Sequence, residues 1–152
     1  MENDKAIDAL NSLITINNDR IEGYETASEI SEEEELQIMF TQFISTSEKC
    51  KQELIREVNT MGGEKAEGTK ASGKFFRTWM DVKAALTGKD RKAVLNSCEN
   101  GEDKAQDAYQ DVLENEMEHL TTDQKNMVVA QKSLLKADHD HVKALRDALI
   151  DA

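Results

Sequence analysis

Four long stretches of the chain place apolar residues at the three- and four-residue spacing of an amphipathic helix. Read as heptads, the first two seams are Ile7, Leu10, Ile14, Asn17, Ile21, Tyr24 and Leu36, Phe40, Phe43, Ser47, Cys50, Leu54. The other two are Leu95, Cys98, Glu102, Ala105, Tyr109, Val112 and Val128, Gln131, Leu135, Asp138, Val142, Leu145. This pattern predicts an all-α protein built as a four-helix bundle.

Start and stop signals predict where these helices begin and end. We expect long helices over residues 3–31, 33–61, 91–120 and 123–151, with a short extra helix over 74–86, all in a single domain spanning residues 1–152. Gly62-Gly63 is a strong helix stop, and Thr121-Thr122-Asp123 is typical of a helix cap.

The lengths of the connections suggest a topology. Two short turns predict that the first and second helices form one antiparallel hairpin and the last two another. The connection between the hairpins is long enough to run the length of a bundle. Such a crossover, which would make the second and third long helices parallel, favours a ferritin-like arrangement over a plain up-down bundle.

Composition supports the helical interpretation and excludes some partners. The 152 residues include no proline and seven glycines, and 33% of them are charged. A net charge of −12 repels phosphate backbones and anionic lipids, so we expect neither nucleic acid nor a membrane as partner. The N-terminal residues lack the features of a signal peptide, which predicts a cytoplasmic protein.

Each apolar seam becomes polar near its middle, at Asn17, Ser47, Glu102 and Asp138. In a bundle these midpoints would meet at one level, where a plain structural core would carry leucine. One interpretation is that Glu102 or Asp138 pairs with a Lys or Arg and fixes the helix register. The other is that the polar groups bind a metal ion.

The metal hypothesis rests on the spacing of Asp138-x-x-His141, which puts both side chains on one helix face. Facing Glu102, with Glu22 contributed by the first helix, they would form a partial site for iron, manganese or zinc. Glu99 is an alternative to Glu102, and the second helix offers Glu48 or Glu53. No histidine precedes Glu118, so half of a two-metal pattern lacks its imidazole. No cofactor is therefore certain, and no catalytic residue is predicted. His139 lies off the seam and is expected to face solvent.

Two further groups of residues carry weaker signals. Cys50 and Cys98 fall on seams, where a free cysteine behaves as a small hydrophobic residue. The short extra helix carries the aromatic-rich cluster Phe75, Phe76, Trp79, Met80. This cluster is expected to close one end or flank of the bundle, with an exposed partner-binding patch as the alternative.

Several motifs together resemble an uncharacterised bacterial family, a domain of unknown function described as a ferritin-like four-helix bundle. They are Asn18-Asp19-Arg20-Ile21-Glu22-Gly23-Tyr24, Gly62-Gly63, Arg77-Thr78-Trp79, Cys98-Glu99-Asn100-Gly101-Glu102-Asp103 and His139-Asp140-His141-Val142. The resemblance implies the ferritin-like fold and its crossover connection, and it implies no established activity. Metal ligation, as in ferritin-like relatives, carries over only to Glu22, Glu102, Asp138 and His141.

The leading hypothesis is a non-catalytic helical bundle of unknown role, with a stress-related role as one option and a structural or vestigial polar centre. The first alternative is a metal-binding or iron-handling protein that uses the partial carboxylate–histidine site. The second is a helical adaptor that binds a protein partner through an exposed Trp79. The seams leave open whether the protein forms a homo-oligomer.

Overall fold

A computed structural model of the chain describes residues 2–67, 81–88 and 90–151. They form four long α-helices, α1 (Glu2–Ile30), α2 (Glu34–Thr60), α4 (Arg91–Asn115) and α5 (Thr122–Asp151), with a 3₁₀ turn, η1 (Met117–His119), before α5. A short helical segment spans residues 81–87. The described part contains no strand, so the protein is all-α, as its periodicity predicts. Residues 74–80 of the predicted short helix, with all four members of its aromatic-rich cluster, lie outside the described residues.

The third long helix is shorter than the sequence pattern predicts. It ends at Asn115, and the chain continues through η1 rather than as regular helix to residue 120. The apolar seam continues past this point to Leu120, which is buried in the core. A 3₁₀ turn keeps that leucine in contact with the core while it tightens the end of the helix, a common use of this geometry at helix termini.

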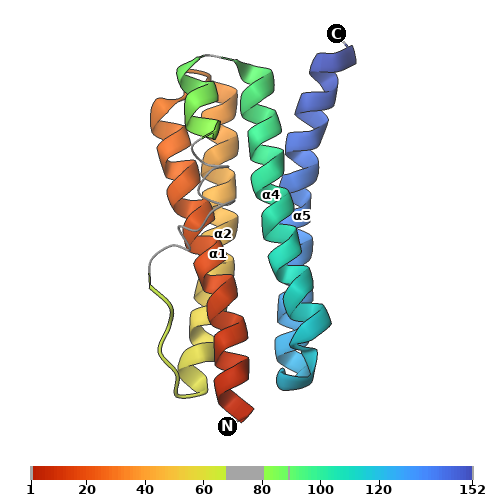
Figure 1. Cartoon of the computed structure of the whole chain (residues 1–152). Coiled ribbons are helices and arrows are strands. Elements are labelled where there is room, and N and C mark those ends of the chain that lie inside the picture. Colours follow the sequence, from red (N-terminus) through yellow and green to blue (C-terminus); the bar gives the residue numbers. More distant parts are fainter. Residues whose placement is uncertain (1, 68–80, 89, 152) are drawn as a thin grey trace.

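The helices run up, down, down and up (Figure 1). Contacts at both ends of the bundle support this order. Arg91, at the start of α4, bonds Glu33 and Glu35 at the start of α2 over 2.6 and 2.8 Å, so α2 and α4 are parallel. Gln124, near the start of α5, bonds Glu57 near the end of α2. One long connection therefore crosses the length of the bundle between α2 and α4, as the connection length predicts.

The second helix ends in a tight glycine motif. Gly62 has φ +78°, the left-handed region that side chains other than glycine rarely adopt. Its N–H donates to Asn59 O over 3.0 Å, and the N–H of Gly63 donates to Val58 O over 3.0 Å. These two bonds form a Schellman motif, which satisfies carbonyls at the end of the helix and turns the chain into the crossover.

We expect Gly62→Ala to lower the free energy of unfolding by about 1–2 kcal/mol, because the Cβ of alanine lies too close to the following carbonyl oxygen in the left-handed region. Open space surrounds the site, so no steric clash contributes. Chemical denaturation of both proteins measures the difference. Gly88→Ala is the matched control: its added methyl group meets only ordinary contacts and its φ is not positive, so it should change stability much less.

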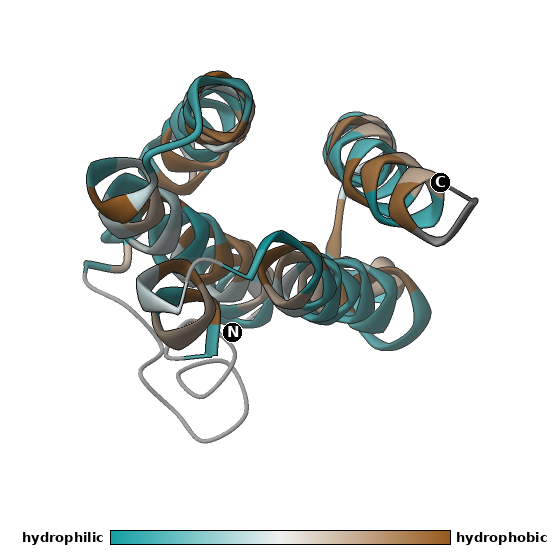
Figure 2. Cartoon of the chain, turned by 90° about the horizontal axis from the view of Figure 1, so that it is seen from above, coloured by the Kyte–Doolittle hydropathy of each residue, from teal (hydrophilic) through white to brown (hydrophobic). Residues whose placement is uncertain are grey.

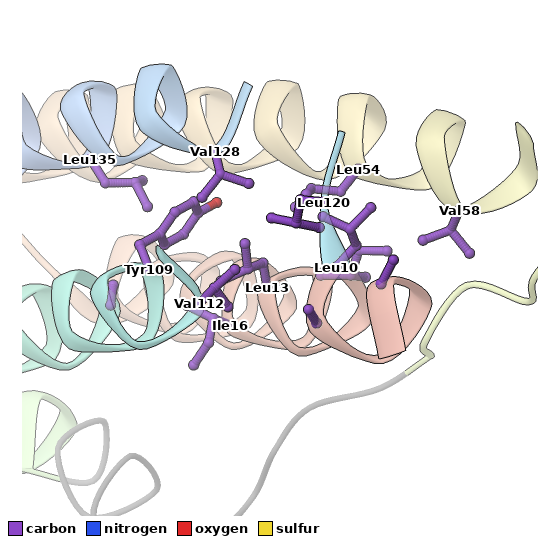
Figure 3. Close-up of a cluster of buried hydrophobic side chains, with 14 residues drawn as sticks. Leu10, Leu13, Ile16, Leu54, Val58, Tyr109, Val112, Leu120, Val128 and Leu135 are labelled. Atoms are coloured by element: carbon purple, nitrogen blue, oxygen red, sulfur yellow. The ribbon is translucent and has the colours of Figure 1, made fainter. Parts of the chain in front are cut away.

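The buried side chains form two hydrophobic clusters, one toward each end of the bundle. Seen from above, each helix carries hydrophobic and hydrophilic positions on different sides (Figure 2). The first cluster gathers Leu10, Leu13, Leu54, Val58 and Val128 from three helices, with the ring of Tyr109 among them (Figure 3). The second surrounds Tyr24, Phe40 and Phe43 and includes Val82 and Leu86 of the short helical segment. The buried polar residues Arg20, Ser47 and Glu102 lie between the two clusters along their helices.

No helix in the described part of the chain is long and apolar enough to cross a lipid bilayer.

Candidate functional site: an arginine-centred polar cluster

The guanidinium of Arg20 lies in the middle of the bundle, with only 1% of the side chain exposed. Arginine is rarely buried to this extent unless its donors are paired. Here its polar partners come from each of the other long helices: Ser47 of α2, Glu102 of α4 and Asp138 of α5. The expected meeting of polar midpoints thus does occur for these three residues, but around a cation supplied by α1.

Glu102 is the main counter-charge. Its Oε1 accepts from Arg20 Nη2 over 2.7 Å and from Nε over 3.2 Å, and it also accepts from the hydroxyl of Tyr24. Glu102 is itself 1% exposed. Its second oxygen, Oε2, is buried and has no hydrogen-bond partner among the described residues. The two buried charges therefore compensate each other through one carboxylate oxygen.

Asp138 forms the outer edge of the cluster. Its Oδ2 accepts from Arg20 Nη2 over 3.1 Å, while 14% of its side chain remains exposed. Burial raises the pKa of this carboxyl to about 6, and Arg20 opposes the shift by favouring the charged form. Burial on its own would lower the pKa of the guanidinium, but Glu102 and Asp138 raise it above its ordinary value, so Arg20 stays charged.

Two aromatic rings also lie close to the guanidinium. Its central carbon lies 5.4 Å from the ring centroid of Tyr24 and 6.0 Å from that of Phe43. These are cation–π distances, at which the electron-rich ring faces attract the cation. The two rings also contact each other edge to face at 5.2 Å. Burial raises the pKa of the Tyr24 phenol well above its usual value, so the phenol keeps its proton and donates to Glu102.

A second polar layer lies beside the Arg20 cluster, toward the first hydrophobic cluster. Asn17 Nδ2 donates to the hydroxyl of Tyr109 over 2.9 Å, and that hydroxyl donates to Gln131 Oε1 over 2.8 Å. Gln131 Nε2 in turn donates to the backbone carbonyl of Cys50 and to a carboxylate oxygen of Glu53. All four long helices again contribute, so Asn17 belongs to this neighbouring layer rather than to the charged one.

The structure brings together only two of the four predicted metal ligands. Glu102 and Asp138 both contact Arg20. His141 is exposed and meets the charged layer only through the edge of Phe43, at a centroid distance of 5.9 Å. Glu22 is exposed and lines a different hollow, with Glu25 and Lys51. The three-residue spacing puts His141 on nearly the same helix face as Asp138, but the two positions still differ by about 60° around the helix. Asp138 contacts Arg20, whereas the His141 side chain is exposed.

Two residues behave differently from the sequence expectations. Arg20 flanks the seam that the heptads define and was assigned no role, although it is the only Lys or Arg between residues 6 and 48. A buried acid that faces this stretch needs a cation as partner. Because Arg20 is the only basic residue there, the sequence could have identified it as that partner. His139, expected to face solvent, has a side chain only 17% exposed and contacts Asp103 of α4.

The two cysteines behave as the seam pattern predicts. Both are free and buried. Burial raises the pKa of the Cys50 thiol to about 11 and that of the Cys98 thiol further, so neither supplies a reactive thiolate at neutral pH.

Comparison with known proteins places the chain in a family. The sequence profile described as Domain of unknown function (DUF2383) matches residues 5–115. The chain belongs to this family. The matched part contains Arg20, Ser47 and Glu102, and it ends before the 3₁₀ turn and α5, which supplies Asp138. No curated protein matches the chain.

Proposed function

We propose that this member of the DUF2383 family is a non-catalytic, ferritin-like helical bundle whose polar centre is structural. The observation that carries the proposal is the position of Arg20. Its guanidinium lies between Glu102 and Asp138, where a carboxylate-bound metal ion would have to sit. The same two acids cannot bind a metal ion there without displacing the buried cation that already pairs with both of them. The single long crossover between α2 and α4 supports the ferritin-like affiliation.

In this proposal the two polar layers hold the helix hairpins in one register. The α1–α2 and α4–α5 hairpins each have an extensive internal interface, whereas the contacts between hairpins are few. The cross-hairpin polar bonds include Arg20 to Glu102 and Asn17 to Tyr109. A slip of one helical turn would leave these buried groups unpaired, which costs far more than an apolar mismatch. Buried polar groups that fix register in coiled coils act in the same way.

Metal analysis of targeted variants tests the proposal. Glu102→Gln removes the main carboxylate of the cluster while keeping its shape, and His141→Ala removes an exposed imidazole. We expect that neither change lowers the metal content of protein purified without chelator or immobilised nickel, measured by elemental analysis. Stoichiometric iron, manganese or zinc that disappears in both variants would show a metal centre at the predicted residues and would refute the structural role.

A further inference from the structure

A second cluster of ionisable side chains lies on the outer seam between α4 and α5. It comprises Glu99 and Asp103, one turn apart on α4, and His139, which faces them from α5. One ligand atom from each residue lies within 4.8 Å of the other two. The site is partly buried: the side chains of Glu99 and His139 are 15% and 17% exposed, whereas that of Asp103 is 51% exposed.

From this geometry we propose that Glu99, Asp103 and His139 bind a divalent transition-metal ion and so link α4 to α5. One imidazole and two carboxylates are the donor set that zinc, manganese and ferrous iron accept. Four-coordinate zinc with bonds of about 2.0–2.1 Å places its ligand atoms roughly 3.3 Å apart. His139 Nε2 and Asp103 Oδ1, now 2.7 Å apart, would open slightly, and Glu99 would close by a side-chain rotation. The exposed Asp103 carboxylate has room to adjust, and solvent can supply the fourth ligand.

The surroundings of the histidine are an independent sign of a metal seat. His139 Nδ1 contacts Asp140 Oδ1 at 3.1 Å, which leaves Nε2 directed at the acids of α4. Metal-bound histidines usually have their other ring nitrogen held by a carboxylate in this way. Asp140 is held in turn by Lys136 Nζ at 2.9 Å. The histidine is thus oriented through a chain of contacts that a plain surface ion pair does not need.

Glu99 has comparable support. Its Oε2 accepts from Arg146 of α5, and Arg146 also bonds Asp147. A carboxylate can hold a guanidinium through one oxygen and a metal ion through the other, so Arg146 can orient Glu99 without competing for the ion. The net charge of −12 on the whole chain adds a favourable long-range attraction for a cation.

This seat is separate from the arginine-centred cluster but adjacent to it. Glu102 and Asp138 point inward to Arg20, while their sequence neighbours Asp103 and His139 meet on the outside. A bound ion would therefore link α4 to α5 on the outside of the bundle, at the same level as the Arg20 guanidinium in its interior. The metal site does not depend on the proposed structural role of Arg20, and either can fail alone.

Zinc titration of the full chain tests the site. By isothermal titration calorimetry near neutral pH we expect one zinc ion per chain and a zinc-dependent rise in melting temperature. Asp103→Asn and His139→Ala should each weaken binding by at least about tenfold, the lower end of what even a supporting residue costs. Asp103→Asn keeps the size and exposure of the side chain, so circular dichroism should show an unchanged fold.

The matched controls remove the other two histidines. His141→Ala takes away the exposed imidazole on the same helix, and His119→Ala the one that lies beside Glu116 and Glu118. Both should leave zinc affinity within about twofold of the parent, well short of the tenfold or greater loss expected for ligand removal. The proposal is overturned if the parent chain binds no zinc, if Asp103→Asn and His139→Ala bind it as tightly as the parent, or if His119→Ala abolishes binding.

Discussion

Replacing Arg20 with methionine is expected to lower the free energy of unfolding by about 3–5 kcal/mol, the cost of breaking a buried ion pair from one side. The methionine fills much of the same volume, so little of the loss comes from a cavity. The penalty arises because Glu102, which is 1% exposed, loses the guanidinium that compensates its charge. The Ser47 hydroxyl and Asp138 lose a partner at the same time.

Denaturant unfolding followed by circular dichroism measures this loss. Arg91→Met is the matched control, because Arg91 also bonds two carboxylates, those of Glu33 and Glu35, but at a solvent-exposed helix start. Exposed pairs of this kind contribute about 0–1 kcal/mol. Equal losses in the two variants would mean that burial adds nothing to the Arg20 cluster and would refute the structural account.

Replacing Tyr109 with phenylalanine is expected to cost about 1–3 kcal/mol. The ring keeps its place in the first hydrophobic cluster, near Val128 and Leu135 (Figure 3). Only the hydroxyl is lost, and with it the donor to Gln131 and the acceptor for Asn17. Both amides are fully buried, so water cannot replace the missing partner without entering the core.

The same unfolding assay measures the Tyr109 effect. Thr41→Val removes a hydroxyl of similar chemistry from an exposed position, where it bonds only a carbonyl of its own helix. That change should stay within about 0.5 kcal/mol. If Tyr109→Phe falls in the same small range, the second polar layer contributes little and the account of two register-setting layers is wrong.

The positions of the helices could be predicted because their signals are local. Apolar spacing of three and four residues, the cap at Thr121 and the glycine pair at Gly62-Gly63 act within a few residues of the boundary they set. The crossover followed from connection length alone. The early end of α4 could not be read in this way, since the seam continues to Leu120 while the backbone changes to a 3₁₀ turn.

The site was harder to predict because it depends on which way each side chain faces. Heptads describe a narrow seam, but the buried face of α1 also takes in Leu13, Ile16 and Arg20. The level of Glu102 and Asp138 and the pairing of these acids with a Lys or Arg were therefore predicted, whereas the identity of that residue, Arg20, was not. The His141 side chain is exposed, whereas His139 contacts Asp103. Only three-dimensional packing separates the inward acids from their outward neighbours.

The wider consequence is that a polar seam does not by itself indicate a catalytic centre. In this bundle acids, hydroxyls and aromatic rings gather around Arg20, whose charge compensates that of Glu102. In the structural role that we propose, such a centre favours a single packing arrangement of the two hairpins, although burying its charges costs more desolvation free energy than an apolar core would. Stability and specificity of register are then distinct properties of the same residues.

A double-mutant cycle between Arg20 and Glu102 tests this central claim most directly. The free energies of unfolding of Arg20→Met, Glu102→Leu and the double variant are compared with that of the parent chain. Arg20→Met leaves the buried Glu102 carboxylate without its counter-charge, and Glu102→Leu leaves the buried guanidinium with Asp138 but without its main counter-charge. The double change removes both buried charges. We predict that the double variant is more stable than either single variant, with a coupling of about 2–3 kcal/mol or more. Losses that simply add in the double variant would contradict the ion pair as the organising contact of the bundle.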